Sequence, residues 1–408
     1  MRLTMLLCTA LLVLCVQIGV RCERPLFRVH IVPGAGVPGA AVPVEILLPA
    51  GLDARSTAGM GLVALSRPSA PPIPVQVVGD RLVCLIPGIS GDEEYSLAPL
   101  PRRAETHFEL EDRGSVTLEL SEHEALVLGY NYGNILAPGV PEDRRRSSYV
   151  HPVMGLDGEI LSSDFPSDHP HHRGLFWAWP RVGVGDQTLD LWHLRGIRHR
   201  FESWTTREAG PVCAVLGVRN GWYLDNGMKV VNEKLTLAVY RAGPIGRVID
   251  ADLQLETTDA SITITGQTDT GYGGFNFRPA QRREEVITTA NGVQREDSNL
   301  VPSAWGDFSA RFGEGESVSG VAIFQHSDNP RFPSGWCLRP YGFLGVDFPG
   351  TERFVLRPGE PLRLRYRVCI HRGDAQDGKV REMYEAFAQP PRAELILSQP
   401  DEYPRKEE

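Results

Sequence analysis

The segment from residue 164 to residue 179, DFPSDHPHHRGLFWAW, concentrates side chains that transfer protons, ligate metals or hold polar ligands. They are three histidines (His169, His171, His172), two aspartates (Asp164, Asp168), one arginine (Arg173) and two tryptophans (Trp177, Trp179). Histidine titrates near neutral pH, and the tryptophans follow each other at period two as flat rings on which a sugar can stack. We therefore take this segment as the candidate site.

The histidines of this segment support two chemical interpretations. In an extended chain His169 and His171 share a side, and two histidines at that spacing can ligate a metal. His151, His193 or a carboxylate could complete a tetrahedral metal site. The second interpretation is proton transfer by an imidazole that Asp168 or Asp164 orients. A third and plainer possibility is that these histidines only form hydrogen bonds within a loop bent by prolines.

Three later segments carry further polar and aromatic side chains that a shared site would use. Asn276 and Arg278 lie at period two at the end of an expected strand, and His326 ends another apolar strand. Residues 336–342, WCLRPYG, add Arg339 and Tyr341. The candidates for proton transfer are therefore His169, His171, His172 and His326, with Asp168 as the orienting group. The candidates for substrate binding are Arg173, Trp177, Trp179, Asn276, Arg278, Arg339 and Tyr341.

The motifs of several common enzyme classes do not occur in this sequence. It has no H-E-x-x-H, no G-x-S-x-G, no P-loop and no Rossmann glycine pattern after a strand, which disfavours nucleotide chemistry and ordinary serine hydrolysis. A glycosidase with two catalytic carboxylates stays possible, although the sequence does not fix the separation of any pair. The carboxylates that can supply such a pair are Glu159, Asp164, Asp168, Glu233 and Asp347.

Composition and the first residues limit the class of protein and its location. The 408 residues are 42% hydrophobic and 23% charged, with a net charge of −9, which argues against a nucleic-acid partner. Arg2 and the apolar run 6–20 predict a signal peptide over residues 1–22, so the protein is expected to be secreted or periplasmic. No later run reaches spanning length, so no stable membrane insertion is expected after the signal is removed.

The spacing of apolar residues predicts an all-β protein with two domains. Strands at 27–32 and 44–48 and a hairpin at 75–86 predict a small N-terminal β-sandwich over residues 23–104. One large antiparallel β-sandwich is expected over residues 105–395, with one helix at 379–388. Residues 396–408 are charged and expected to be disordered. One disulfide or none is expected among the four cysteines outside the signal, Cys84, Cys213, Cys337 and Cys369.

Strand 362–370 is the clearest single case of alternation. Leu362, Leu364, Tyr366, Val368 and Ile370 share one face, and three arginines occupy the opposite face. That polar face either meets solvent or lines a concave cleft.

Several of these segments together resemble the DUF6807, or PmoA-like, family. The matching pieces are YVHPV at 149–153, DHPHHRGLFW at 168–177, DLWH at 190–193, GFNFR at 274–278, HSDNP at 326–330 and WCLRPYG at 336–342. The resemblance covers roughly residues 105–375. It implies exported bacterial proteins with a galactose-mutarotase-like supersandwich and a link to carbohydrate breakdown. Members are often named methane oxygenase PmoA, but such a subunit spans the membrane and this mature chain has no spanning segment.

These observations lead to three hypotheses of function. The first is a secreted carbohydrate-active enzyme, a hydrolase, lyase or epimerase, that uses histidine-based acid–base chemistry on a glycan or another polar small molecule. The second is a metalloenzyme, hydrolytic or oxidative, whose divalent metal is held by histidines from the set His151, His169, His171 and His193. The third is a glycan-binding protein without catalysis, in which the tryptophans matter and the histidines do not.

Overall fold

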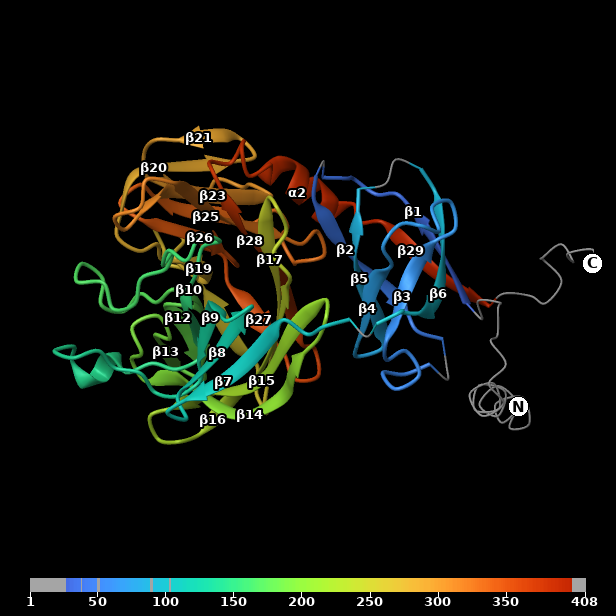
Figure 1. Cartoon of the computed structure of the whole chain (residues 1–408). Coiled ribbons are helices and arrows are strands. Elements are labelled where there is room, and N and C mark those ends of the chain that lie inside the picture. The colour runs from blue at the N-terminus through green and yellow to red at the C-terminus, as the bar shows by residue number, and fades with distance from the viewer. Residues whose placement is uncertain (1–26, 38, 50–51, 89–90, 103, 398–408) are drawn as a thin grey trace, which may run out of the picture. The chain divides into compact units, whose positions relative to one another are not determined.

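The computed structural model describes residues 27–37, 39–49, 52–88, 91–102 and 104–397. The expected signal peptide at 1–22 lies outside these residues, as does most of the expected tail at 396–408. The described chain is nearly all β-structure, as predicted, and it divides into two compact units (Figure 1). No helix among the described residues is long and apolar enough to cross a membrane.

The N-terminal unit is built on a seven-stranded antiparallel sheet in the order β2-β5-β4-β3-β6-β1-β29. Its strands are β1 (Phe27–Val32), β2 (Ala41–Leu47), β3 (Met60–Ala64), β4 (Ile73–Val78), β5 (Arg81–Pro87), β6 (Glu93–Pro99) and β29 (Arg392–Leu397). The predicted strand at 27–32 and the predicted hairpin, which pairs Val78 with Arg81, are confirmed. Valine, leucine and isoleucine from alternate positions of these strands form its core.

The last strand of this sheet comes from the other end of the chain. β29 pairs antiparallel with β1, with Val29 opposite Leu395. The boundary expected at residue 395 therefore falls inside a strand of the N-terminal sheet. Short alternation of this kind predicts a strand but does not name its partner.

The C-terminal unit is a sandwich of two nine-stranded antiparallel sheets with a smaller four-stranded sheet. The first sheet has the order β22-β25-β26-β19-β11-β10-β9-β8-β7, and the second has the order β14-β15-β16-β17-β28-β24-β23-β20-β21. The small sheet has the order β13-β12-β18-β27.

The bounds of these elements follow the chain. The strands of the first sheet are β7 (Phe108–Arg113), β8 (Thr117–Glu122), β9 (Ala125–Asn131), β10 (Tyr149–Val153), β11 (Leu175–Ala178), β19 (Gly274–Phe277), β22 (Ser298–Asn299), β25 (Gly335–Arg339) and β26 (Phe343–Asp347). Those of the second sheet are β14 (Ile197–Ala209), β15 (Cys213–Leu224), β16 (Lys229–Tyr240), β17 (Gly246–Thr257), β20 (Arg282–Thr289), β21 (Gly292–Gln294), β23 (Trp305–Phe312), β24 (Val318–Gln325) and β28 (Leu362–Arg372). The small sheet contains β12 (Arg181–Val184), β13 (Gln187–Leu189), β18 (Ile262–Thr265) and β27 (Phe354–Leu356). The helical elements are the 3-10 turn η1 (Glu142–Arg144) and the helix α2 (Val380–Ala388).

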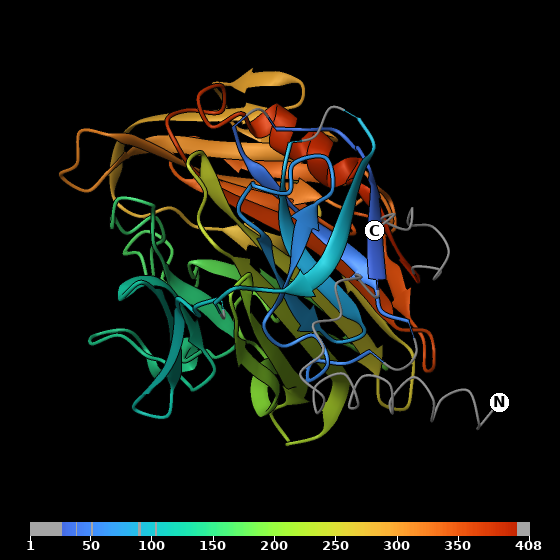
Figure 2. The same ribbon diagram turned by 45° about the vertical axis from the view of Figure 1, so that its right-hand side comes forward.

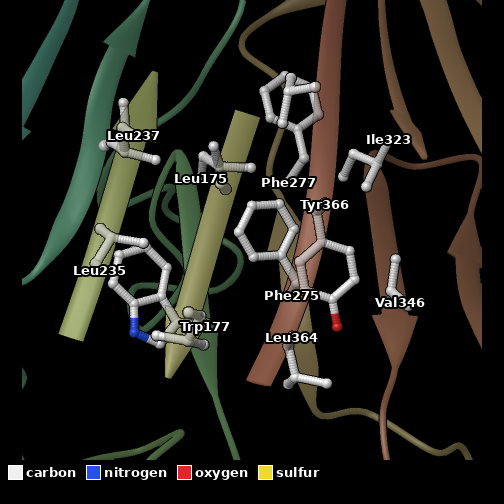
Figure 3. Packing of buried hydrophobic residues seen from close by; sticks show 14 of the residues in the cluster. Leu175, Trp177, Leu235, Leu237, Phe275, Phe277, Ile323, Val346, Leu364 and Tyr366 are labelled. Carbon is white, nitrogen blue, oxygen red and sulfur yellow. The ribbon is translucent and has the colours of Figure 1, made fainter. Parts of the chain in front are cut away.

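The core of the C-terminal unit lies between its two large sheets. Figure 3 shows side chains of β11 and β19 from the first sheet meeting side chains of β16, β24 and β28 from the second. Phe275 stacks on Tyr366 across the gap, with ring centroids 4.5 Å apart. The predicted apolar face of 362–370 is therefore confirmed as a core face.

The arginines of β28 lie on the opposite face, as the alternation predicts, and each finds a carboxylate. Arg363 pairs with Asp252, Arg365 with Asp328, and Arg367 with Asp250 at 2.6 Å. The guanidinium of Arg367 also lies 4.7 Å from the ring of Phe387 on α2. Figure 2 shows this helix, which contacts β24 and β28 and covers part of that face. The cysteines Cys84, Cys213, Cys337 and Cys369 are all buried.

Candidate functional site

The first sheet has a second face, which carries most of the expected site. Along β19, Phe275 and Phe277 belong to the sandwich core, so Asn276 points to the other side of the sheet. On β26, Leu344 and Val346 face the core, and Phe343, Gly345 and Asp347 take the other side. We call this side the outer face. The other side chains of the site come from the segments 162–174 and 190–195, from the turn before β19, and from the end of β25 with the turn that follows it.

Four imidazole rings from two of these segments form one contiguous group, here called the histidine cluster (His169, His171, His172 and His193). His169 stacks on His172 with centroids 4.7 Å apart and planes 7° apart. His171 lies 4.6 Å from His172 and 4.4 Å from His193. The side chains of His169 and His193 are 35% and 32% exposed, whereas His172 is buried.

The histidine segment is a pair of turns, not an extended chain. The amide of His169 donates to Pro166 O at 3.1 Å, and the amide of His172 donates to His169 O at 2.8 Å. The second turn stacks His172 on His169. The segment is therefore not extended, and the condition under which His169 and His171 would share a side is not met. Pro166 and Pro170 favour such turns, because a proline fixes its φ and cannot donate to a ladder.

Aromatic rings surround the cluster. Phe343 lies 5.1 Å from His172, and Trp192 lies 5.7 Å from it. Tyr341 stacks on the exposed side of His169 at 5.3 Å, with planes 6° apart. The hydroxyls of Tyr341 and Tyr272 are 3.2 Å apart, and burial raises the pKa of both phenols, which keeps them neutral.

Two arginines bring positive charge to this face. Arg278 donates from Nη2 to both carboxylate oxygens of Asp168, at 2.8 and 2.6 Å, and lies 5.3 Å from the ring of Tyr341. Burial opposes ionisation of Asp168, but the hydrogen bonds from Arg278 prevail and lower its pKa to about 2. Arg339 lies 5.0 Å from the ring of Tyr272, and its Nη2 donates to Asn299 at 2.6 Å.

Buried polar atoms without a protein partner gather on the same face. They are His172 Nδ1, Asn276 Oδ1, Arg278 Nε and Nη1, and both carboxylate oxygens of Asp347. Burial raises the pKa of Asp347 well above its ordinary value, so this carboxyl is held as the neutral acid. Most buried polar groups of folded proteins have a hydrogen-bond partner, so such a group of exceptions marks a place where a ligand can complete the bonding.

Charge and burial also separate the four histidines. Burial, together with the nearby His193 and Arg146, lowers the pKa of His171 to about 2. Burial lowers the pKa of His172 well below its ordinary value. Both rings are therefore neutral at pH 7 and serve as hydrogen-bonding groups. The two half-exposed rings, His169 and His193, are the members of the cluster that can exchange a proton with a ligand or with solvent.

Each of these half-exposed rings has an aspartate beside it. His169 Nδ1 lies 3.0 Å from Asp168 Oδ2, in ion-pair contact but without hydrogen-bond geometry. His193 Nδ1 is hydrogen-bonded to Asp190 Oδ2 at 2.8 Å, and the amide of His193 donates to Asp190 Oδ1 at 2.8 Å. His193 was expected only as a metal ligand, and the aspartate three residues before it is the signal in the sequence for this different role.

Arg173 supports the histidine segment from behind. Its side chain is 0% exposed and donates to the carbonyls of Pro170, His172 and Arg144 at 2.9, 2.6 and 2.7 Å. It also lies 3.4 Å from Asp164, whose pKa burial raises to about 6 against the opposing effect of Arg173. These bonds occupy the guanidinium, so Arg173 holds the loop in place and is not positioned to contact a substrate.

The two tryptophans expected as a stacking platform are part of the core. Trp177 is 1% exposed, and its ring lies within 9° of parallel to that of Phe275, with centroids 6.4 Å apart. Figure 3 shows both side chains among the core residues. Trp179 is 0% exposed, and its Nε1 donates to Phe348 O at 2.7 Å. The two tryptophans do share one face, as their spacing predicts, but that face packs in the sandwich core. The exposed ring beside the cluster is Tyr341.

Several other candidates lie apart from the cluster. His326 directly follows β24 of the second sheet and contacts Phe387 of α2 at 5.4 Å. His151 is hydrogen-bonded to Ser162 Oγ at 2.9 Å, and Glu233 is buried beside His199 at 3.1 Å. Glu159 accepts a hydrogen bond from Ser319 of the second sheet. Within the described residues, no three histidine, cysteine, aspartate or glutamate side chains are arranged to hold a metal ion.

Comparison with known proteins gives a family but no activity. The model of DUF6807, a family of unknown function, matches residues 117–385. The match includes the histidine cluster and every outer-face side chain described above. It leaves out all seven strands of the N-terminal sheet. No protein of curated function matches the chain.

Proposed function

The chain belongs to the DUF6807 family, and we propose that its C-terminal unit is a carbohydrate-active enzyme that uses histidine acid–base chemistry. In this proposal a sugar or glycan binds on the outer face of the first sheet and undergoes hydrolysis, elimination or epimerisation. We also propose that residues 1–22 direct export of the protein to the periplasm or out of the cell. The resemblance to PmoA-like proteins likewise stays a prediction from the sequence.

The observation that carries the proposal is the set of buried polar atoms without partners on the outer face, which includes Nδ1 of His172 in the histidine cluster. Asn276 Oδ1 accepts hydrogen bonds, Arg278 donates them, and the neutral carboxyl of Asp347 does both. A polyol presents hydroxyls that match such a mixed set. The exposed ring of Tyr341 adds a flat apolar surface of the kind on which the C–H face of a sugar ring packs.

The proton-transfer group of this proposal is His169. It is half-exposed, lies between the rings of His172 and Tyr341, and has Asp168 at 3.0 Å. The stacked rings hold the imidazole plane, and the negative charge of Asp168 stabilises the protonated form during transfer. His172 is buried and neutral, so it acts by accepting or donating a hydrogen bond at Nδ1.

The proposal is tested on a panel of methyl hexosides, methyl hexuronides and soluble oligosaccharides, with products followed by proton NMR. We expect the wild-type chain to consume at least one member, and His169→Ala to lower that rate by about 10²–10⁴-fold, the contribution of a positioned proton-transfer group. His172→Ala is expected to lose turnover as well. His30→Ala, which changes a partly exposed histidine of the N-terminal unit beside Asp92, is the matched control and keeps the wild-type rate.

Folding of each variant is checked by far-UV circular dichroism and by tryptophan fluorescence. Full activity in both His169→Ala and His172→Ala refutes the proposal. Binding of a panel sugar without its consumption also refutes catalysis, and favours a glycan-binding protein.

A further inference from the structure

A second aspartate–histidine pair stands at the other end of the histidine cluster. Asp190 and His193 are three residues apart in the segment between β13 and β14, outside any regular strand. The ring of His171 contacts both half-exposed imidazoles, His193 at 4.4 Å and His169 at 5.8 Å. The cluster therefore ends in two rings that reach solvent, with neutral rings between them.

The hydrogen bond to Asp190 fixes the tautomer of His193. Burial opposes ionisation of Asp190, but the hydrogen bonds of His193 lower its pKa, so Asp190 is a carboxylate at neutral pH. An ionised carboxylate only accepts hydrogen bonds. His193 Nδ1 must therefore carry the hydrogen of the 2.8 Å bond, and the lone pair of the neutral ring lies on Nε2.

The two aspartates differ in what else they bind. Asp168 is shared with Arg278, which donates to both of its oxygens, and it has no hydrogen-bond geometry to His169. Asp190 instead uses its two carboxylate oxygens on the amide and the ring of His193. Asp168 therefore shares its negative charge between Arg278 and His169, whereas Asp190 forms its hydrogen bonds with His193.

We propose that His193, oriented by Asp190, is the general base of the reaction, and that His169 on the other side of His171 is the matching acid. This rests on the proposed function of the outer face. In the step, the lone pair of His193 Nε2 forms an N–H bond with the proton of a substrate hydroxyl or of water. The O–H bonding pair stays on oxygen, and Asp190 balances the imidazolium. His169 returns a proton to the departing or newly charged oxygen.

Two variants test this assignment. His193→Gln keeps a polar side chain but has no basic nitrogen. Asp190→Asn keeps an oxygen for the amide of His193 but offers an N–H to Nδ1, which moves the ring hydrogen to Nε2 and removes the base. We expect each to lower the turnover of the panel sugar that the wild type consumes by about 10²–10⁴-fold with folding retained. Asp190→Glu, which keeps the carboxylate, should recover part of the loss.

The tautomer gives a readout that a purely structural role of Asp190 would not move. In the nitrogen-15 spectrum of histidine-labelled protein, His193 should show a protonated Nδ1 and an unprotonated Nε2 in the wild type, with the reverse in Asp190→Asn. His30→Gln is the control, because His30 also lies beside an aspartate but in the N-terminal unit.

The outcomes separate this inference from the proposed function. A wild type that consumes panel sugars while His193→Gln keeps more than a tenth of the rate overturns the role of His193 and leaves the proposed function standing. An unprotonated Nδ1 in the wild type also overturns it. A wild type that consumes no panel sugar overturns the proposed function, and the inference falls with it.

Discussion

Asp347→Asn should make the C-terminal unit more stable above acidic pH while impairing the site. Asp347 is 1% exposed, and neither carboxylate oxygen has a hydrogen-bond partner among the described residues. Burial therefore raises its pKa well above the ordinary value of 3.8. Asparagine has nearly the same shape and never ionises, so the substitution removes the titration and leaves the packing in place.

The magnitude follows from the linkage between proton binding and folding. Between the unfolded pKa, about 3.9, and the raised folded pKa, the folded chain keeps a proton that the unfolded chain has lost. The free energy of unfolding therefore falls as pH rises, by about 1.4 kcal/mol per pH unit for this one group. Above the folded pKa the loss is complete and stays constant.

Tryptophan fluorescence during urea unfolding is the assay. All seven tryptophans lie between residues 177 and 336, so the signal reports the C-terminal unit alone. We expect the stability of Asp347→Asn minus that of the wild type to grow from pH 4 upward and then level off. The matched control is Asp307→Asn, which changes a buried aspartate that is bonded to His371 at 2.8 Å and is therefore expected to be destabilising.

A difference between Asp347→Asn and wild type that does not change between pH 4 and pH 8 would refute the reasoning. It would mean that Asp347 ionises alike in the folded and unfolded chains, and the neutral acid assigned to the site would be lost.

Three further predictions concern groups around the site and in the core. Glu233→Ala leaves His199 buried without its carboxylate and should cost about 3–5 kcal/mol in urea unfolding. The guanidinium of Arg173 donates to three carbonyls, and lysine has no planar group that could replace all three bonds. Differential scanning calorimetry of Arg173→Lys should therefore show a lower Tm for the C-terminal unit. The folded pKa of His171 lies below its unfolded value, so its contribution to stability is lost as pH falls below about 6.5. His171→Gln should accordingly weaken the acid sensitivity of unfolding between pH 6.5 and pH 4, and an unchanged slope would contradict the shift.

The strands were the part of the fold that the sequence predicted best. Alternation located 27–32 as it stands in the structure and assigned both faces of 362–370 correctly, because strongly apolar and strongly charged residues alternate there. The alternation of residues did not indicate which strands pair with each other. Nothing in residues 392–397 shows that this strand returns to β1, since a strand partner 360 residues away leaves no local trace.

The site shows a similar division. Residue types alone singled out His169, His172, Asn276, Arg278, Arg339 and Tyr341, and the structure brings these side chains to one face of the first sheet. Trp177 and Trp179 were assigned to the wrong face of their strand. Leu175–Ala178 is apolar on both faces, so the spacing of the tryptophans did not show which face packs in the core. Asp347 was named only as one of five carboxylates that could supply a catalytic pair, because it ends an otherwise apolar strand with no neighbouring signal of a site.

The most direct test of the account is to locate a bound sugar by NMR of ring-labelled histidines. The measurement uses His169→Ala, because its slow turnover lets the complex with the sugar persist while spectra are recorded. We expect the sugar that the wild type turns over to shift the signals of His171, His172 and His193 and to leave those of His30 and His326 in place. Shifts at His326 or His30 with the cluster unchanged would contradict it and would move the site away from the outer face.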